Sequence, residues 1–136
     1  MDSRRKLLTR LGGLARTSEL VANGDEVEWL RIARNYGKLI HVRQGWWALP
    51  DTPRDVLAAW RAGGRLACVS ALAYHGVTVE LGERLHVELA ANSRGARNPL
   101  VAVHWSTDQR NGDRRAVSVE VALRQASRCR AATGTL

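Results

Sequence analysis

The sequence lacks any apolar run near the roughly 20 residues that span a bilayer, and its charged first ten residues lack the apolar core of a signal peptide. It has only two cysteines, Cys68 and Cys129, and no cluster of cysteine and histidine with metal-ligand spacing, so no metal site is expected. Two thiols without an export signal predict reduced, buried cysteines. These absences predict a soluble, cytoplasmic protein without membrane contact.

Catalytic motifs are also missing. The chain has no phosphate-binding glycine loop, no nucleophile elbow and no zinc-protease motif. Of its four histidines, His86 and His104 lie on alternating segments and could face one another, and His75 is expected to interact with carbonyls at a helix C-terminus. A metal nuclease would add a lysine to its acidic residues, and the region after His86 has none. We therefore expect neither catalysis nor a cofactor.

Lysine is scarce, since Lys6 and Lys38 are the only two, and arginine supplies almost all of the net charge of +8. Coding bias accounts for arginine in place of lysine but not for the excess of positive charge. Residues 1–50 carry 9 positive and 5 negative side chains, residues 51–100 carry 6 and 5, and residues 101–136 carry 6 and 3. Because arginine suits phosphates and guanine edges, two basic ends predict a polyanion held at two places.

The first 50 residues predict three helices and a hairpin. Residues 4–11 form a helix with Leu7, Leu8 and Leu11 inward; Thr17 caps a helix over 18–22; Asp25 caps a longer one to about Tyr36. The runs LIHVR and WWAL flank Gln44-Gly45 and predict a hairpin. This order is that of a winged helix-turn-helix over residues 1–50.

The rest of the chain predicts a small mixed half over residues 51–130 and a flexible tail over 131–136. Thr52 is expected to cap a helix over 53–62, and a second helix covers 68–75. The runs VTVEL, RLHVELA and LVAVHWS alternate like half-buried strands, which we expect to be antiparallel, and AVSVEVALRQASRC begins as a strand and ends as a helix. The predicted fold class is therefore α+β.

A helical wheel over residues 25–38 places Arg31, Arg34, Asn35 and Lys38 on one arc, opposite an apolar arc of Trp29, Leu30, Ile32, Ala33 and Tyr36. A cationic arc with this stagger fits the major groove, where arginine pairs with guanine and asparagine with adenine. Glu28 borders the arc and either reads a cytosine or is solvated. In the hairpin, Arg43 is the candidate for the minor groove, and Gln44 lies beside it. Trp46 and Trp47 point to opposite faces, one packed on the helices and the other a stacking platform or covered.

Further candidate DNA contacts are Thr17 and Ser18 and the basic residues Arg4, Arg5 and Lys6, which either clamp phosphate or form a loose arm. A possible second contact region comprises Arg94, Arg97, Arg110, Arg114 and Arg115.

The stretches GGLARTSELVANG and KLIHVRQGWWALP resemble the winged-helix domain of AbiEi-type antitoxins, and DVLAAWRAGGRLACVSALAYHGV with RLHVELA resembles the segment that follows it in actinobacterial relatives. A doubled tryptophan replaces the more usual Val-Tyr after the wing glycine. The resemblance implies repression of transcription, through Arg31, Arg34, Asn35, Lys38 and Arg43. A phage immunity repressor of the same build would fit equally.

The sequence thus predicts a repressor that binds a double-stranded DNA operator. Its second half either contacts DNA, forms a homodimer or binds a toxin. The alternative function is a protein-binding antitoxin or adaptor module that neutralises a partner toxin.

Overall fold

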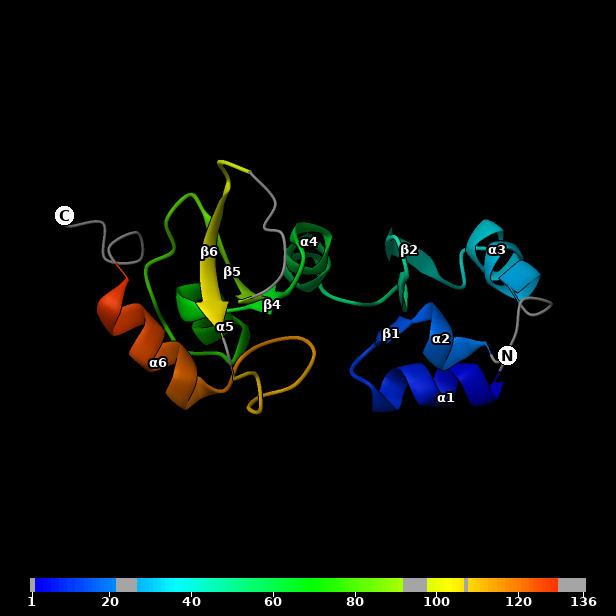
Figure 1. Cartoon of the computed structure of the whole chain (residues 1–136), viewed down its shortest axis with the longest axis horizontal. Coiled ribbons are helices and arrows are strands. Elements are labelled where there is room, and N and C mark those ends of the chain that lie inside the picture. The colour runs from blue at the N-terminus through cyan, green and yellow to red at the C-terminus, as the bar shows by residue number, and fades with distance from the viewer. Residues whose placement is uncertain (1, 22–26, 92–97, 107, 130–136) are drawn as a thin grey trace. The chain divides into compact units, whose positions relative to one another are not determined.

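The computed structural model describes residues 2–21, 27–91, 98–106 and 108–129 (Figure 1). It divides into two compact units, Met1–Pro53 (unit 1) and Arg54–Leu136 (unit 2). Helices and strands are mixed in both units, so the chain is of the α+β class. In the described ranges, none of the helices has the length and apolar character that crossing a membrane demands. The expected tail at 131–136 lies outside the described residues.

Unit 1 combines three helices with a three-stranded sheet. Its elements are α1 (Asp2–Arg10), β1 (Leu14–Arg16), α2 (Thr17–Leu20), α3 (Val27–Asn35), β2 (Ile40–Arg43) and β3 (Trp46–Ala48). The strands have the order β1-β3-β2, and both pairings are antiparallel. The central strand β3 therefore holds the hairpin to the strand that follows α1.

Every helix of unit 1 contributes to one apolar core. Leu8 of α1, Leu20 of α2 and Leu30 of α3 are buried together, as the amphipathic patterns predict. Leu7 and Leu11 pack against them, which confirms the inward face predicted for the first helix. This core fixes α3 by one side and leaves its other side to solvent.

The termini of α2 and α3 differ from the prediction. Arg16 rather than Thr17 is the N-cap of α2, and its backbone N–H donates to Glu19 Oε1 at 2.8 Å. Helix α3 ends at Asn35, and Gly37 follows in the left-handed region with φ +72°. Since a glycine in this conformation ends a helix, Lys38 lies beyond α3 and not one helical turn after Arg34. The predicted cap Asp25 lies outside the described residues.

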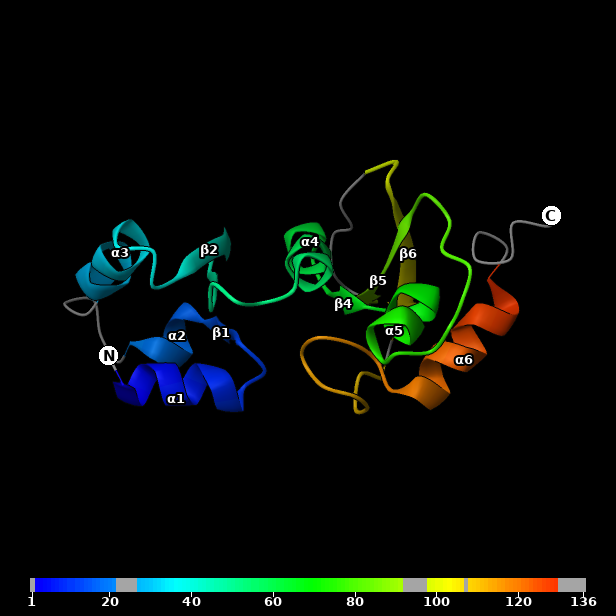
Figure 2. The ribbon, with the colours of Figure 1, turned by 180° about the vertical axis from the view of Figure 1, so that it is seen from behind.

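Unit 2 has helices on a second three-stranded sheet. Its elements are α4 (Arg54–Ala62), β4 (Arg65–Leu66), α5 (Cys68–Tyr74), β5 (Leu85–Ala90), β6 (Val101–Ser106) and α6 (Val119–Arg128). Views from both sides show α5 against the sheet and α6 beside α5 (Figures 1 and 2). The buried side chains of α5 run from Cys68 to Leu72 and form the centre of this unit.

The sheet of unit 2 corrects two predictions. Strands β4 and β5 are antiparallel, but β5 and β6 are parallel over six residue pairs from Leu85↔Val101 to Ala90↔Ser106. Alternation predicts which face a side chain takes but not the direction of its strand, so the expected antiparallel pairing was wrong here. The run VTVEL is not a strand either; Val77 instead donates its N–H to Leu72 O at 2.9 Å after the end of α5.

The start of α4 differs from the prediction. The helix begins at Arg54, and the Thr52 hydroxyl caps nothing, because this buried oxygen has no hydrogen-bond partner among the described residues.

Gly64 lies so close to β5 that a Cβ at its position would be 1.8 Å from Glu88 O. Glycine is therefore required where β4 begins.

Candidate nucleic-acid interface and a cysteine–histidine cluster

The outward side of α3 carries the predicted DNA-reading residues. Arg31, Arg34 and Asn35 are exposed, whereas Leu30 and Ala33 are buried in the core of unit 1. Lys38 is also exposed, after the helix end. A polar, cationic surface therefore lies on the side of the helix away from the core.

The predicted apolar arc of α3 is only partly correct. Ile32 is 47% exposed and Tyr36, just beyond the helix, is 77% exposed, although both were expected inward. Val27 at the start of α3 is 46% exposed as well. The core of this small unit covers only the positions around Leu30 and Ala33, so apolar side chains accompany the cations at the surface.

Arg31 differs from Arg34 in its surroundings. Its guanidinium forms an ion pair with Glu28, one helical turn earlier, with both side chains more than half exposed. An exposed pair of this kind is weak, and a phosphate or a base edge competes with it easily. Glu28 therefore restrains Arg31 in the free protein, and the outward cation of Arg34 has no acidic residue one turn before it.

The hairpin places Arg43 and Gln44 at an exposed turn between β2 and β3. Behind the turn, Trp47 packs against the core and donates its indole N–H to Thr17 Oγ1 at 2.9 Å. Trp47 is thus the tryptophan that packs on the helices, as predicted. The Thr17 hydroxyl accepts this indole N–H and so has a structural role in unit 1. Ser18 beside it is exposed.

The Trp46 ring lies on the other side of β3, half-buried, with the Arg16 guanidinium 5.3 Å from its centre. A cation over an aromatic face is a favourable contact. Arg16 therefore covers the ring that a single-strand binder would use for stacking.

The basic residues of α1 are not a loose arm, because they lie within a helix. Arg4 places its guanidinium 4.4 Å from the centre of the Trp29 ring and donates from Nε to Leu20 O at 2.9 Å. It joins α1 to the end of α2 and to α3, so Arg4 has a structural role in the free protein. Arg5 and Lys6 are exposed.

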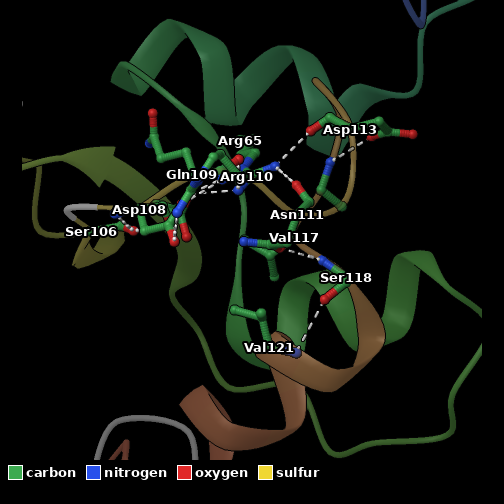
Figure 3. A network of polar contacts seen from close by, with 12 residues as sticks. Arg65, Ser106, Asp108, Gln109, Arg110, Asn111, Asp113, Val117, Ser118 and Val121 are labelled. Carbon is green, nitrogen blue, oxygen red and sulfur yellow. Dashed lines mark hydrogen bonds and ion pairs between the residues drawn. The ribbon is translucent and has the colours of Figure 1, made fainter.

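Of the predicted second contact region in unit 2, the structure describes Arg110, Arg114 and Arg115. Arg94 and Arg97 lie outside the described residues. Arg110 pairs with Asp108 through Nε at 3.0 Å and Nη2 at 3.3 Å (Figure 3). Arg114 and Arg115 are half-buried, and the carbonyl of Arg114 accepts the Trp60 indole N–H at 2.7 Å. These arginines belong to a structured loop.

Arg65 holds that loop in place through hydrogen bonds, a role that no sequence pattern predicted. Its buried guanidinium lies 2.9 Å from the buried Glu88 carboxylate, its partner across β4 and β5. The remaining donors bond to loop carbonyls, to Gln109 O at 3.2 Å and to Asp113 O at 2.9 Å, and also to Asn111 O (Figure 3). Since a buried charge is tolerated only when it is paired and hydrogen-bonded, this network fixes the path of residues 109–113.

The expectation that cysteine and histidine do not cluster was wrong. Cys68 at the start of α5, His86 in β5, His104 in β6 and Cys129 after α6 bring one nitrogen or sulfur atom each to within 4.8 Å of one another. His86 Nδ1 is 3.0 Å from His104 Nε2, so these histidines do face each other. Cys129 Sγ is 3.8 Å and 3.7 Å from these same two nitrogens. We call these four residues the Cys/His cluster.

Burial shifts the pKa of three members of the Cys/His cluster, His86, His104 and Cys68. It lowers the pKa of His86 to about 4, an effect increased by the charges of His104 and Arg84. Burial also lowers the pKa of His104, and it raises the pKa of the Cys68 thiol to about 12, with a smaller contribution from Cys129. Both imidazoles are therefore neutral at neutral pH.

Sequence reasoning missed the cluster because its residues are 18 or more positions apart. His75, the remaining histidine of unit 2, is the C-cap of α5, and its Nε2 lies 2.8 Å from Val117 O, a carbonyl outside that helix.

Comparison of the chain with models of protein families gives no match, and comparison with curated proteins gives none either.

Proposed function

We propose that this protein is a repressor that binds double-stranded DNA through unit 1, built as a winged helix-turn-helix. The order of three helices and a hairpin, with the hairpin joined to β1 in one sheet, supports this architecture. The observation that carries the proposal is the exposed polar side of α3, where Arg34 and Asn35 lie next to each other in a unit whose core holds the opposite side.

In this proposal α3 lies in the major groove and the hairpin follows the backbone. Arg34 donates to a guanine and Asn35 pairs with an adenine. Arg31 exchanges Glu28 for DNA on binding. The exposed Lys38, Arg43 and Gln44 contact phosphates or the minor groove, and Arg5 and Lys6 add phosphate contacts.

The setting we propose is that of a cytoplasmic transcription regulator without enzymatic activity. The resemblance to AbiEi-type antitoxins supports an autoregulator of a toxin–antitoxin operon, and a phage immunity repressor of the same build fits the same site. Arg110, with its charge paired to Asp108, is a weaker candidate for a second contact than the residues of α3.

Selection from a pool of random duplexes, followed by fluorescence anisotropy on the selected duplex and a scrambled one, tests the proposal. Arg34→Ala should weaken binding to the selected duplex by about 1–3 kcal/mol and relax specificity at one base. Arg61→Ala is the matched control, because it removes the same charge from an exposed position in unit 2. For the unaltered protein, the logarithm of the binding constant should fall linearly with the logarithm of the salt concentration.

If Arg34→Ala and Arg61→Ala lose equal affinity for the selected duplex, Arg34 contributes only its positive charge and does not recognise a base. Absence of duplex binding even at low salt would overturn the proposal and favour the protein-binding module. A preference for single strands that depends on Trp46 would favour the single-strand binder instead.

A further inference from the structure

We propose that the Cys/His cluster is a structural zinc site in which Cys68, His86, His104 and Cys129 coordinate one Zn²⁺ ion. Two sulfur and two imidazole ligands in tetrahedral arrangement are the donor set that zinc prefers. This inference concerns unit 2 and is independent of DNA binding.

The distances within the cluster fit such an ion. Zinc bonds of roughly 2.0–2.1 Å to nitrogen and 2.3 Å to sulfur, at tetrahedral angles, separate two nitrogens by about 3.3 Å and a nitrogen from a sulfur by about 3.6 Å. The cluster has 3.0 Å between the two imidazole nitrogens, and 3.7 Å and 3.8 Å from Cys129 Sγ to each of them. Cys68 Sγ lies within 4.8 Å of all three atoms. Shifts of a few tenths of an ångström bring His86, His104 and Cys129 into this geometry, and a shift of up to about 1 Å brings in Cys68.

The backbone at Cys68 supports a requirement for its thiol. Cys68 has φ +53°, the only positive value for a non-glycine residue among the described residues. Glycine adopts this conformation without strain, so a cysteine here indicates that the side chain matters. The Cys68 N–H donates to Gln125 Oε1 of α6 at 2.9 Å, which fixes the position from which the sulfur points.

The surroundings of the cluster are also suited to a metal. The backbone of His86 is held in place, because its N–H donates to Ser70 Oγ at 2.9 Å. On one side the cluster meets a surface hollow of about 430 Å³ lined by His104 and Cys129, which gives an ion an entry path. Because all four ligands are protein side chains, the site has no open position for a substrate, and its role is structural.

The ion would join four separate segments of unit 2. Cys129 is the C-cap of α6, and its coordination would fasten the end of this helix to β5, β6 and the start of α5. Metal binding and the folding of unit 2 should therefore be coupled.

The first test is the metal content of the tag-free, full-length protein purified without chelator. We expect about one zinc ion per chain by elemental mass spectrometry. After zinc removal, Co²⁺ alone should produce the d–d absorption of a tetrahedral site with thiolate-to-cobalt charge transfer. The melting temperature of the stripped protein should rise with free Zn²⁺ concentration.

Variants identify the ligands. Cys129→Ser and His104→Gln should each reduce the bound zinc severalfold or more, and should alter the cobalt spectrum. His41→Gln, which removes an imidazole from unit 1, is the matched control and should keep the full metal content. Because the wild-type measurement needs no variant, unfolding of a variant does not remove the test.

Three results would overturn the proposal. The first is far less than one zinc ion per chain together with a melting temperature that neither zinc nor chelator changes. The second is a cobalt spectrum without the thiolate band. The third is a disulfide between Cys68 and Cys129 in the native protein, found by mass spectrometry of the alkylated chain.

Discussion

Unit 1 and unit 2 bury different kinds of side chain. The core cluster of unit 1 is apolar, and the charges of α3 and the hairpin turn lie at its surface. Unit 2 instead buries Arg65, Glu88 and His86 inside its sheet. The comparison teaches that a pattern of polar and apolar residues describes unit 1 well, whereas unit 2 depends on specific polar partners that meet only in the folded chain.

The largest effect should come from breaking the buried ion pair of unit 2. Glu88→Gln leaves the Arg65 guanidinium buried without a counter-charge, which should cost roughly 3–5 kcal/mol in unfolding free energy. Two indole N–H signals in NMR spectra report each unit separately, since Trp60 donates to Arg114 O in unit 2 and Trp47 to Thr17 in unit 1. The Trp60 signal should be lost first during denaturation.

Leu30→Ala should destabilise unit 1 instead of unit 2. It opens a cavity in the core of unit 1, should cost about 2–5 kcal/mol there, and should affect the Trp47 signal first. Asp108→Asn, which removes an exposed partner of Arg110, should leave the unfolding curve unchanged. Simultaneous loss of both indole signals in either variant would show that the two units are not stabilised separately.

A smaller effect concerns the backbone of unit 2 at Cys68, which has a positive φ. In the presence of chelator, Cys68→Gly should be more stable than Cys68→Ala by roughly 1–2 kcal/mol, because both remove the thiol but only glycine relieves the left-handed conformation. Denaturant titration of the two variants measures the difference. Equal stabilities would mean that position 68 does not keep its positive φ in solution.

The smallest effect concerns the surface of unit 1. Glu28→Ala removes the exposed partner of Arg31 and should change the unfolding free energy by less than about 1 kcal/mol. It should also strengthen duplex binding modestly, because it frees a cation and removes a negative charge near phosphate. Glu120→Ala makes the same change in the first turn of α6 and is the control. Weaker duplex binding by Glu28→Ala alone would instead indicate that Glu28 itself contacts a base.

Much of unit 1 was predictable from its sequence. The spacing of Leu7, Leu8 and Leu11 predicted the inner face of α1, and the two β-rich runs around Gly45 predicted the hairpin. Local patterns were sufficient because neighbours along the chain decide these features. The errors, such as the exposed Ile32 and Tyr36, occur where the extent of the core decides burial.

Unit 2 was predicted less well for a physical reason. Alternation in β5 and β6 identified both strands and let His86 and His104 face each other, but it carried no information on strand direction. The Arg65–Glu88 pair joins residues 23 positions apart, and the members of the Cys/His cluster are 18 or more positions apart, so both depend on contacts between elements. Spacing rules for metal motifs apply to ligands that share a loop or a helix, so they could not find this cluster.

The sequence by itself determined the basic charge, the helices with an apolar side and the hairpin, because each follows from composition or from the period of side chains along a single element. Only the tertiary structure decided which charges are buried, that β5 and β6 run parallel, and that two cysteines meet two histidines. Those outcomes depend on how separate elements pack, and packing brings together residues whose distance along the chain carries no sign of their contact.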